Sequence, residues 1–100
     1  IKLAGAVEGI DVIVSGHAHR GIEVPYIHPK TGTLIVQTYG YGTRLGYLKL
    51  FFDGEKVTRH EGRLLKVWSD KLKPDPLVEK KISYYKEKVD HIIGEVVGYS

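Results

Sequence analysis

Two histidines separated by a single residue carry the clearest chemical information in this sequence. They stand in Gly16-His17-Ala18-His19, directly after a short run of β-branched residues. Neutral imidazoles bind zinc, manganese and iron-type ions, and the small side chain of Ala18 leaves the space between the two rings free. Gly16 is expected to permit the close backbone approach that lets both rings reach one site. The spacing therefore predicts a metal site to which His17 and His19 contribute.

Two imidazoles do not complete a metal site. A structural zinc ion takes about four protein ligands and a catalytic zinc ion about three. The other candidates are His28, His60, His91 and the carboxylates, whose positions relative to the pair do not indicate a shared site. The alternative that two loop histidines cap a turn, or occur together by chance, therefore remains open from spacing alone.

The element before the histidines is predicted to be a buried strand. Residues 1–9 are small and apolar and predict the last turns of a helix that ends at Gly9. Residues 10–16 predict a strand that is apolar on both faces, as in the interior of an α/β sheet. Ligands of open α/β sheets bind beyond the carboxyl ends of the strands. This is where His17 and His19 stand.

The centre of the chain is predicted to be rich in strands. Glycines and prolines in residues 17–33 predict a loop with a brief extended piece, and residues 30–33 predict a turn. An Asp53-Gly54 pair predicts a two-residue hairpin turn. The strands are expected at residues 34–38, 45–52 and 57–68, and the extended piece at residues 22–27.

The last third of the chain predicts an amphipathic helix. Asp75 is a suitable N-cap, Pro76 suits the first helical position, and Gly94 is expected to end the helix. One apolar stripe at spacings of three and four is formed by Val78, Ile82, Tyr85, Val89 and Ile92. The predicted fold class is therefore α/β (or α+β), with a β-rich centre and a C-terminal helix.

Composition limits the possible functions. The chain has 100 residues, of which 42% are hydrophobic and 27% charged, as expected for a folded domain. Its net charge of +3 is too small to indicate nucleic acid or an acidic membrane, and no apolar run approaches the ~18–20 residues of a membrane span. The lack of cysteine excludes disulfides, thiolate catalysis and Cys-based zinc sites. Because the chain contains no methionine, Ile1 is not expected to be the translational start.

The histidine segment also resembles a known motif. GIDVIVSGHAH, residues 9–19, is similar to the last metal-binding motif of the calcineurin-like metallophosphoesterases, in particular the 5′-nucleotidase and 2′,3′-cyclic-nucleotide phosphodiesterase branch. Residues 34–42 with Leu45-Gly46 resemble the segment that follows this motif. Asp75-Pro76, the tyrosine-containing helix and Ile93-Gly94 resemble the stretch that leads out of the catalytic domain. The resemblance thus covers nearly the whole chain in order.

The resemblance implies a fold and a reaction. Residues 1–94 would be the C-terminal portion of the catalytic domain, a four-layer α/β/β/α sandwich, and residues 95–100 the start of a linker toward a nucleotide-recognition domain. Two divalent ions (Mn²⁺, Zn²⁺ or similar) would hold the phosphate, activate water and stabilise the phosphoryl charge, with His17 on one ion and His19 on the other. The implied activity is hydrolysis of phosphate esters of nucleotides, in a periplasmic, secreted or cell-surface enzyme.

The family's other ligands have no match in this chain. An Asp-x-His motif, a Gly-Asp pair, an Asn-His dipeptide and a further histidine are all expected upstream of the pair. We therefore expect the chain to hold two of roughly seven or eight ligands, and to be inactive and metal-free when isolated. Unpaired strand edges predict a homo-oligomer or a strand-swapped assembly.

Two alternative functions remain open at this stage. The chain could be a non-catalytic fragment that self-associates, or a small basic module that binds nucleic acid. The second alternative would use lysines and tyrosines of the helix, but acidic residues interrupt this face, which favours a solvated surface and no nucleic-acid partner. The residues concerned are Lys80, Lys81, Lys86, Lys88, Tyr84 and Tyr85, interrupted by Glu79, Glu87 and Asp90.

Residues near the histidines allow similar alternatives. Arg20, Arg44 and His60 could meet a phosphate, although exposed cations are the favoured interpretation. Tyr39 and Tyr41 could stack on a base, but packing beside a glycine-rich turn is favoured.

Overall fold

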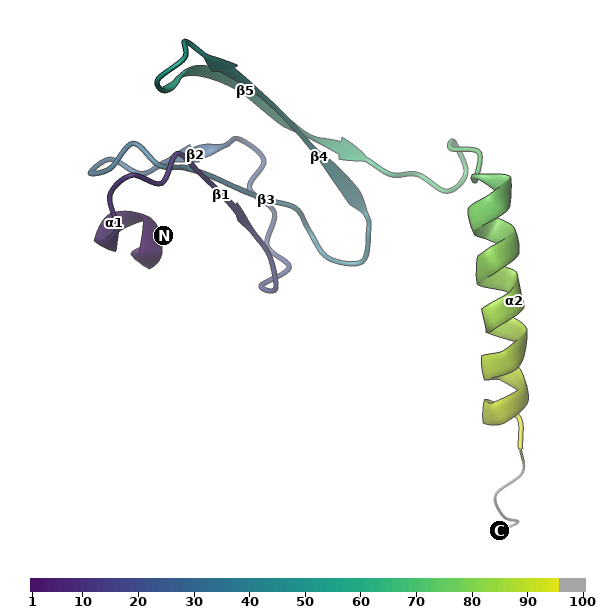
Figure 1. Cartoon of the computed structure of the whole chain (residues 1–100). Coiled ribbons are helices and arrows are strands. Elements are labelled where there is room, and N and C mark those ends of the chain that lie inside the picture. Colours follow the sequence, from purple (N-terminus) through teal and green to yellow (C-terminus); the bar gives the residue numbers. More distant parts are fainter. Residues whose placement is uncertain (96–100) are drawn as a thin grey trace. The chain divides into compact units, whose positions relative to one another are not determined.

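The computed structural model describes residues 1–95, which form two compact units, one from Ile1 to Trp68 and one that begins at Ser69 (Figure 1). The mixture of strands and helices agrees with the predicted α/β class. The segment predicted as a linker, residues 95–100, lies outside the described residues except for Glu95. The first unit contains α1 (Lys2–Ala6), β1 (Val12–Ser15), β2 (Tyr26–Ile27), β3 (Leu34–Gln37), β4 (Arg44–Phe52) and β5 (Val57–Lys66), and the second contains α2 (Pro76–Ile93).

Strand β3 is the centre of a three-stranded sheet with the order β1-β3-β2. It runs parallel to β1, with Val12 opposite Leu34 and Ser15 opposite Gln37, and antiparallel to β2. Since β3 has a neighbour on each side, its residues are the best shielded from water. The buried residues of the described chain are Ala4, Thr33, Leu34, Ile35 and Gln37.

Strand β1 is more exposed than its sequence predicts. The prediction of burial on both faces is wrong for the described residues, because Val14 is 81% exposed. The physical reason is that β1 makes its main contacts with β3, in the plane of the sheet, and no helix or hairpin of the described residues packs closely over its faces. The preceding helix also ends earlier than predicted, since Val7 caps α1 in an extended conformation and Gly9, with φ +81°, lies in the turn before β1.

The turn before β3 is anchored on α1. Thr31 donates a hydrogen bond to the Ala4 carbonyl (2.8 Å), and the Lys30 ammonium donates to the Gly5 carbonyl (3.2 Å). These bonds satisfy carbonyl groups that a short helix leaves without partners. The predicted turn at residues 30–33 is confirmed, with Gly32 at φ +74°. His28, one of the further ligand candidates, is half-buried here, and its ring lies where a side chain on Gly5 would have to go.

Strands β4 and β5 form an antiparallel hairpin, as predicted, but its turn contains four residues rather than two. Asp53 starts the turn, and its carboxylate accepts hydrogen bonds from the backbone N–H groups of Glu55 (2.9 Å) and Lys56 (3.0 Å). These bonds, with the one from Lys56 contributing most, hold the pKa of Asp53 below its ordinary value of 3.8. The carboxylate therefore supports the turn above that value, and its support is lost as the pH falls through the lowered pKa.

Glycines let the hairpin approach the three-stranded sheet. A Cβ atom on Gly62 of β5 would lie 2.4 Å from Cγ of Pro25, and one on Gly46 of β4 would lie 3.2 Å from Cγ2 of Thr38. The opposite face of the hairpin carries cations over aromatic rings, including the Arg59 guanidinium 3.7 Å from the Phe51 ring centre. The hairpin thus has one face toward the sheet and one polar face.

Helix α2 begins and ends at the predicted residues. The Asp75 carboxylate accepts hydrogen bonds from the N–H groups of Leu77 (2.9 Å) and Val78 (3.1 Å), and Gly94 is the C-cap. The predicted apolar stripe is present, but no residue of α2 is buried. No helix within residues 1–95 combines the length and apolarity needed to cross a bilayer.

Candidate metal centre

The parallel pairing of β1 and β3 decides what surrounds the histidines. Ser15 ends β1 opposite Gln37, which ends β3. Because the two strands run in the same direction, the segments that follow them start at the same edge of the sheet. Residues 16–20 after β1 therefore meet residues 38–42 after β3.

The curl of the histidine segment is made by the histidines themselves. His17 and His19 both have left-handed backbones, with φ +68° and +53°, and the N–H of Ala18 donates to the Gly16 carbonyl (2.8 Å). Left-handed backbones are uncommon in residues other than glycine. The role predicted for Gly16 is wrong, because its φ is not positive and a Cβ atom there would meet open space.

Gln37 anchors the loop that carries the histidines. Its side chain is 8% exposed, and its Nε2 group donates to the Arg20 carbonyl (2.7 Å). The backbone carbonyl of Gln37 accepts a hydrogen bond from the Ile22 N–H group (2.9 Å). A buried amide that satisfies a loop carbonyl holds that loop in one place. This role of Gln37 was not predicted from the sequence, although a polar residue at the end of an apolar strand is a recognisable pattern.

Tyr39 fixes the next part of the same loop. Its hydroxyl donates to a Glu23 carboxylate oxygen (2.9 Å), and a Cβ atom on Gly21 would lie only 2.2 Å from the Tyr39 ring. The hydrogen bond to Glu23 and the charge of that carboxylate raise the pKa of Tyr39 above its ordinary value of 10.0. Arg44 lies 5.5 Å from the centre of this ring. The Tyr39 ring therefore packs against the backbone of Gly21, beside the glycine-rich turn, as favoured from the sequence. The Arg44 guanidinium packs over this ring.

His19 lies between two residues of the segment after β3. Its ring centre is 5.0 Å from that of Tyr41, with the two planes at 72° in an edge-to-face arrangement. On the backbone of Gly40, an added Cβ atom would lie 2.7 Å from Cγ and Nδ1 of His19. Gly40 and Tyr41 therefore shape the position of this imidazole.

The histidine pair fits a divalent ion as part of a donor set. Both residues are exposed, and neither imidazole makes a hydrogen bond or ion pair within residues 1–95, so ring nitrogens remain available to a ligand. Imidazole nitrogen is a suitable donor for zinc and manganese-type ions. The described part of the chain contains no group of three or more His, Cys, Asp or Glu residues placed to hold a metal ion.

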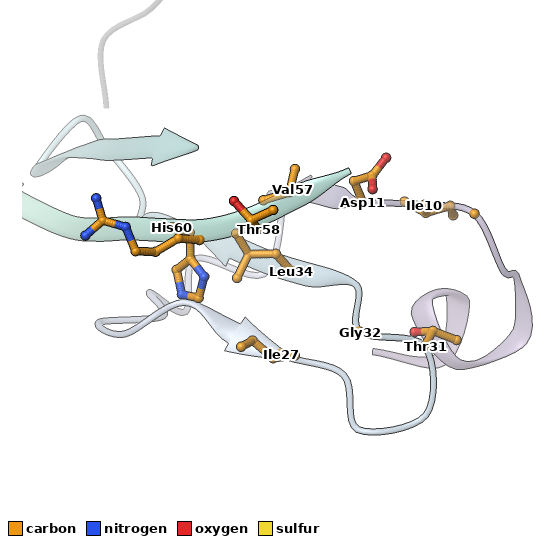
Figure 2. Close-up of a pocket in the computed structure, with 11 residues that line it drawn as sticks. Ile10, Asp11, Ile27, Thr31, Gly32, Leu34, Val57, Thr58 and His60 are labelled. Carbon is orange, nitrogen blue, oxygen red and sulfur yellow. The ribbon is translucent and has the colours of Figure 1, made fainter. Parts of the chain in front are cut away.

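The cavity in Figure 2 lies at the other end of the sheet. It has a volume of about 250 Å³ and is lined by residues that precede β1 and β3 and by the first residues of β5. The His60 imidazole extends from β5 toward Ile27, whereas the Asp11 carboxylate points away from both of these side chains (Figure 2). Arg59 in its wall is engaged by Glu61 at 3.2 Å and by Phe51. His60 is therefore separated from the histidine pair, and this cavity is not the candidate metal centre.

The chain is similar in sequence to known nucleotide phosphoesterases. It is 30% identical over 112 residues to a 5′-nucleotidase of Diplobatis ommata, a match that covers 96% of the chain and 19% of the relative. It is 26% identical over 103 residues to the trifunctional nucleotide phosphoesterase protein YfkN of Bacillus subtilis, covering 100% of the chain and 7% of the relative. A snake venom 5′-nucleotidase of Naja atra is 26% identical over 114 residues, covering 97% of the chain and 21% of the relative.

These matches confirm the resemblance to the 5′-nucleotidase type of phosphoesterase. The chain spans about a fifth of the length of the 5′-nucleotidases it matches and less of the bacterial protein. No family model matches the chain, and no solved structure matches it.

Proposed function

We propose that this chain contributes His17 and His19 as metal ligands to a phosphohydrolase that acts on phosphate esters of nucleotides. The observation that carries the proposal is the histidine pair itself, exposed on a curled segment at the joint carboxyl ends of β1 and β3. The names of the relatives, 5′-nucleotidase and nucleotide phosphoesterase, support the substrate class. The proposed fold of the complete catalytic domain is the four-layer α/β/β/α sandwich of the calcineurin-like enzymes, with residues 1–94 at its C-terminal side.

Other residues of this chain would hold and orient His17 and His19. Two divalent ions, when bound, supply electrostatic stabilisation of charge on the phosphoryl oxygens. Gln37 and Tyr39 hold the loop through their bonds to the Arg20 carbonyl and Glu23. This support matters because a metal site depends on residues that fix the direction of each ligand.

Removal of metal from the full-length protein tests the proposal. Treatment with EDTA is expected to reduce phosphate release from a nucleoside 5′-monophosphate and from bis-p-nitrophenyl phosphate to background. Added Mn²⁺ should restore it. Activity that persists unchanged after chelation would contradict the proposal. Tight, steeply salt-dependent oligonucleotide binding without any response to Mn²⁺ would instead support the basic-module alternative.

The 100-residue chain alone is proposed to be inactive and to self-associate. Two histidines leave most of a metal site unfilled, and exposed apolar residues such as Val14 on the edge strand and Ile82 on α2 favour association. We expect no measurable hydrolysis of bis-p-nitrophenyl phosphate and a dimer or larger species in light scattering at tens of micromolar. Robust metal-dependent hydrolysis by this chain would refute the proposed inactivity. A monodisperse monomer would refute the proposed self-association.

We further propose that the full-length protein acts outside the cytoplasm, in the periplasm, at the cell surface or as a secreted enzyme. The venom origin in the name of one relative supports this location. Fractionation of the source cells, with activity assayed in each fraction, tests it, and activity confined to the cytoplasm would exclude it.

A further inference from the structure

Tyr41 has a backbone conformation that tyrosine rarely adopts. Within residues 1–95, the non-glycine residues with positive φ are His17, His19 and Tyr41, at +68°, +53° and +61°. Tyr41 and Gly42 (φ +66°) are the central residues of a turn closed by a hydrogen bond from Thr43 N–H to the Gly40 carbonyl (3.4 Å). Positive φ at both central positions is the pattern of a type I′ turn, which favours Asn, Asp or Gly. A tyrosine at this position therefore carries a conformational cost.

Burial of its ring does not offset this cost. Tyr41 is 93% exposed, so its ring gains little from the hydrophobic effect. The Tyr41 ring contacts His19 in the edge-to-face arrangement, with 5.0 Å between the ring centres. The strained tyrosine thus touches one of the two candidate ligands.

Gly40 confines His19 from another direction. A Cβ atom on Gly40 would lie 2.7 Å from two atoms of the imidazole and 3.2 Å from a third. Gly40 is not among the residues with positive φ, so its backbone does not require glycine. Glycine is required at this position because the His19 ring occupies the space that a side chain would need. The imidazole therefore lies against the Gly40 backbone and the Tyr41 ring.

We propose that Tyr41 is a positioning residue for His19. The Tyr41 ring, together with the Gly40 backbone, limits the orientations of the His19 imidazole and directs its nitrogen toward a divalent ion. The proposal rests on the proposed function, because it assumes that His19 is a metal ligand. A ligand held in one orientation binds more tightly, since less conformational freedom is lost on binding.

The test uses the full-length protein and a substitution that relieves the backbone while it removes the ring. Tyr41→Asn suits the type I′ position, so the melting temperature should stay the same or rise. Mn²⁺ affinity measured by titration calorimetry should nevertheless fall by about three- to ten-fold, the range of an aromatic contact. Tyr41→Phe retains the ring and should keep the affinity within about two-fold. Gly40→Ala should weaken binding by about ten-fold or more, because the methyl group displaces the imidazole.

Tyr84→Ala is the matched control. Tyr84 makes an edge-to-face pair with Tyr85 on α2, with ring centres 5.2 Å apart and an angle of 76°, nearly the geometry of the His19–Tyr41 pair. Its loss should leave the Mn²⁺ affinity unchanged. If Tyr41→Asn and Gly40→Ala both bind Mn²⁺ like the unsubstituted protein while His19→Ala does not, the positioning role is wrong and the proposed function stands. If His19→Ala itself binds Mn²⁺ normally, the assignment of His19 as a ligand fails, and the positioning role fails with it.

Discussion

Replacing His17 or His19 by alanine in the full-length protein is expected to lower metal-dependent phosphate release by more than about 100-fold. Residues that only support a metal ligand cost about 10–100-fold when removed, and loss of a ligand should cost at least as much. Because each histidine would serve a different ion of a two-metal site, either substitution alone should be sufficient. The measurement is the rate of nucleotide hydrolysis at saturating Mn²⁺, together with the bound metal content of each purified variant.

His91→Ala provides the control for these variants. His91 is an exposed histidine in the last turn of α2, in the second compact unit. Its replacement should leave both the rate and the bound metal unchanged. Full activity and full metal content in His17→Ala and in His19→Ala would remove the site assignment. The metal content should also fall on acidification, because a coordinating imidazole must be neutral.

Replacing Ile35 by alanine is expected to destabilise the first unit by about 2–5 kcal/mol. Ile35 is 3% exposed at the centre of β3, so the truncation leaves a cavity where little other apolar burial exists to compensate. A loss of this size is a large share of the ~5–15 kcal/mol that stabilises a typical domain. Hydrogen-exchange mass spectrometry of the peptide that covers β3 in the full-length protein measures the change in opening free energy.

Two further variants make this prediction specific. Ile35→Val removes one methyl group and should cost about 0.5–1.5 kcal/mol. Val24→Ala changes a residue that is 77% exposed and should stay within about 0.5 kcal/mol of the original protein. Equal exchange protection in Ile35→Ala and Val24→Ala would show that β3 is not the core strand.

The agreement between sequence and structure is best where the relevant interaction is local. The N-cap of α2 is an example, since Asp75 bonds the N–H groups of Leu77 and Val78 only two and three residues away. Hairpin formation by β4 and β5 was also predictable, because alternating strand residues flank a glycine turn. The turn length was not, because the Asp53 carboxylate can bond N–H groups two and three residues on and so stabilises a four-residue turn.

Burial of β1 shows where pattern analysis fails. An apolar run indicates that a strand can be covered on both faces, but whether it is covered depends on which other segments pack against it. In the described residues β1 pairs with β3 alone, and Val14 remains exposed. The pattern of apolar residues indicates which secondary structure and degree of burial a segment favours. It does not indicate where that segment lies in a sheet.

The sequence by itself determined the candidate ligands, the chemistry available to imidazole, and the order of helices and strands around them. Only the tertiary structure decided which residues hold those ligands. Tyr41 reaches His19 because β1 and β3 pair in parallel with Ser15 opposite Gln37, which brings together segments separated by about twenty residues of sequence. Such a contact depends on strand order and register, which are set by packing across the whole unit and leave no periodic trace in the chain.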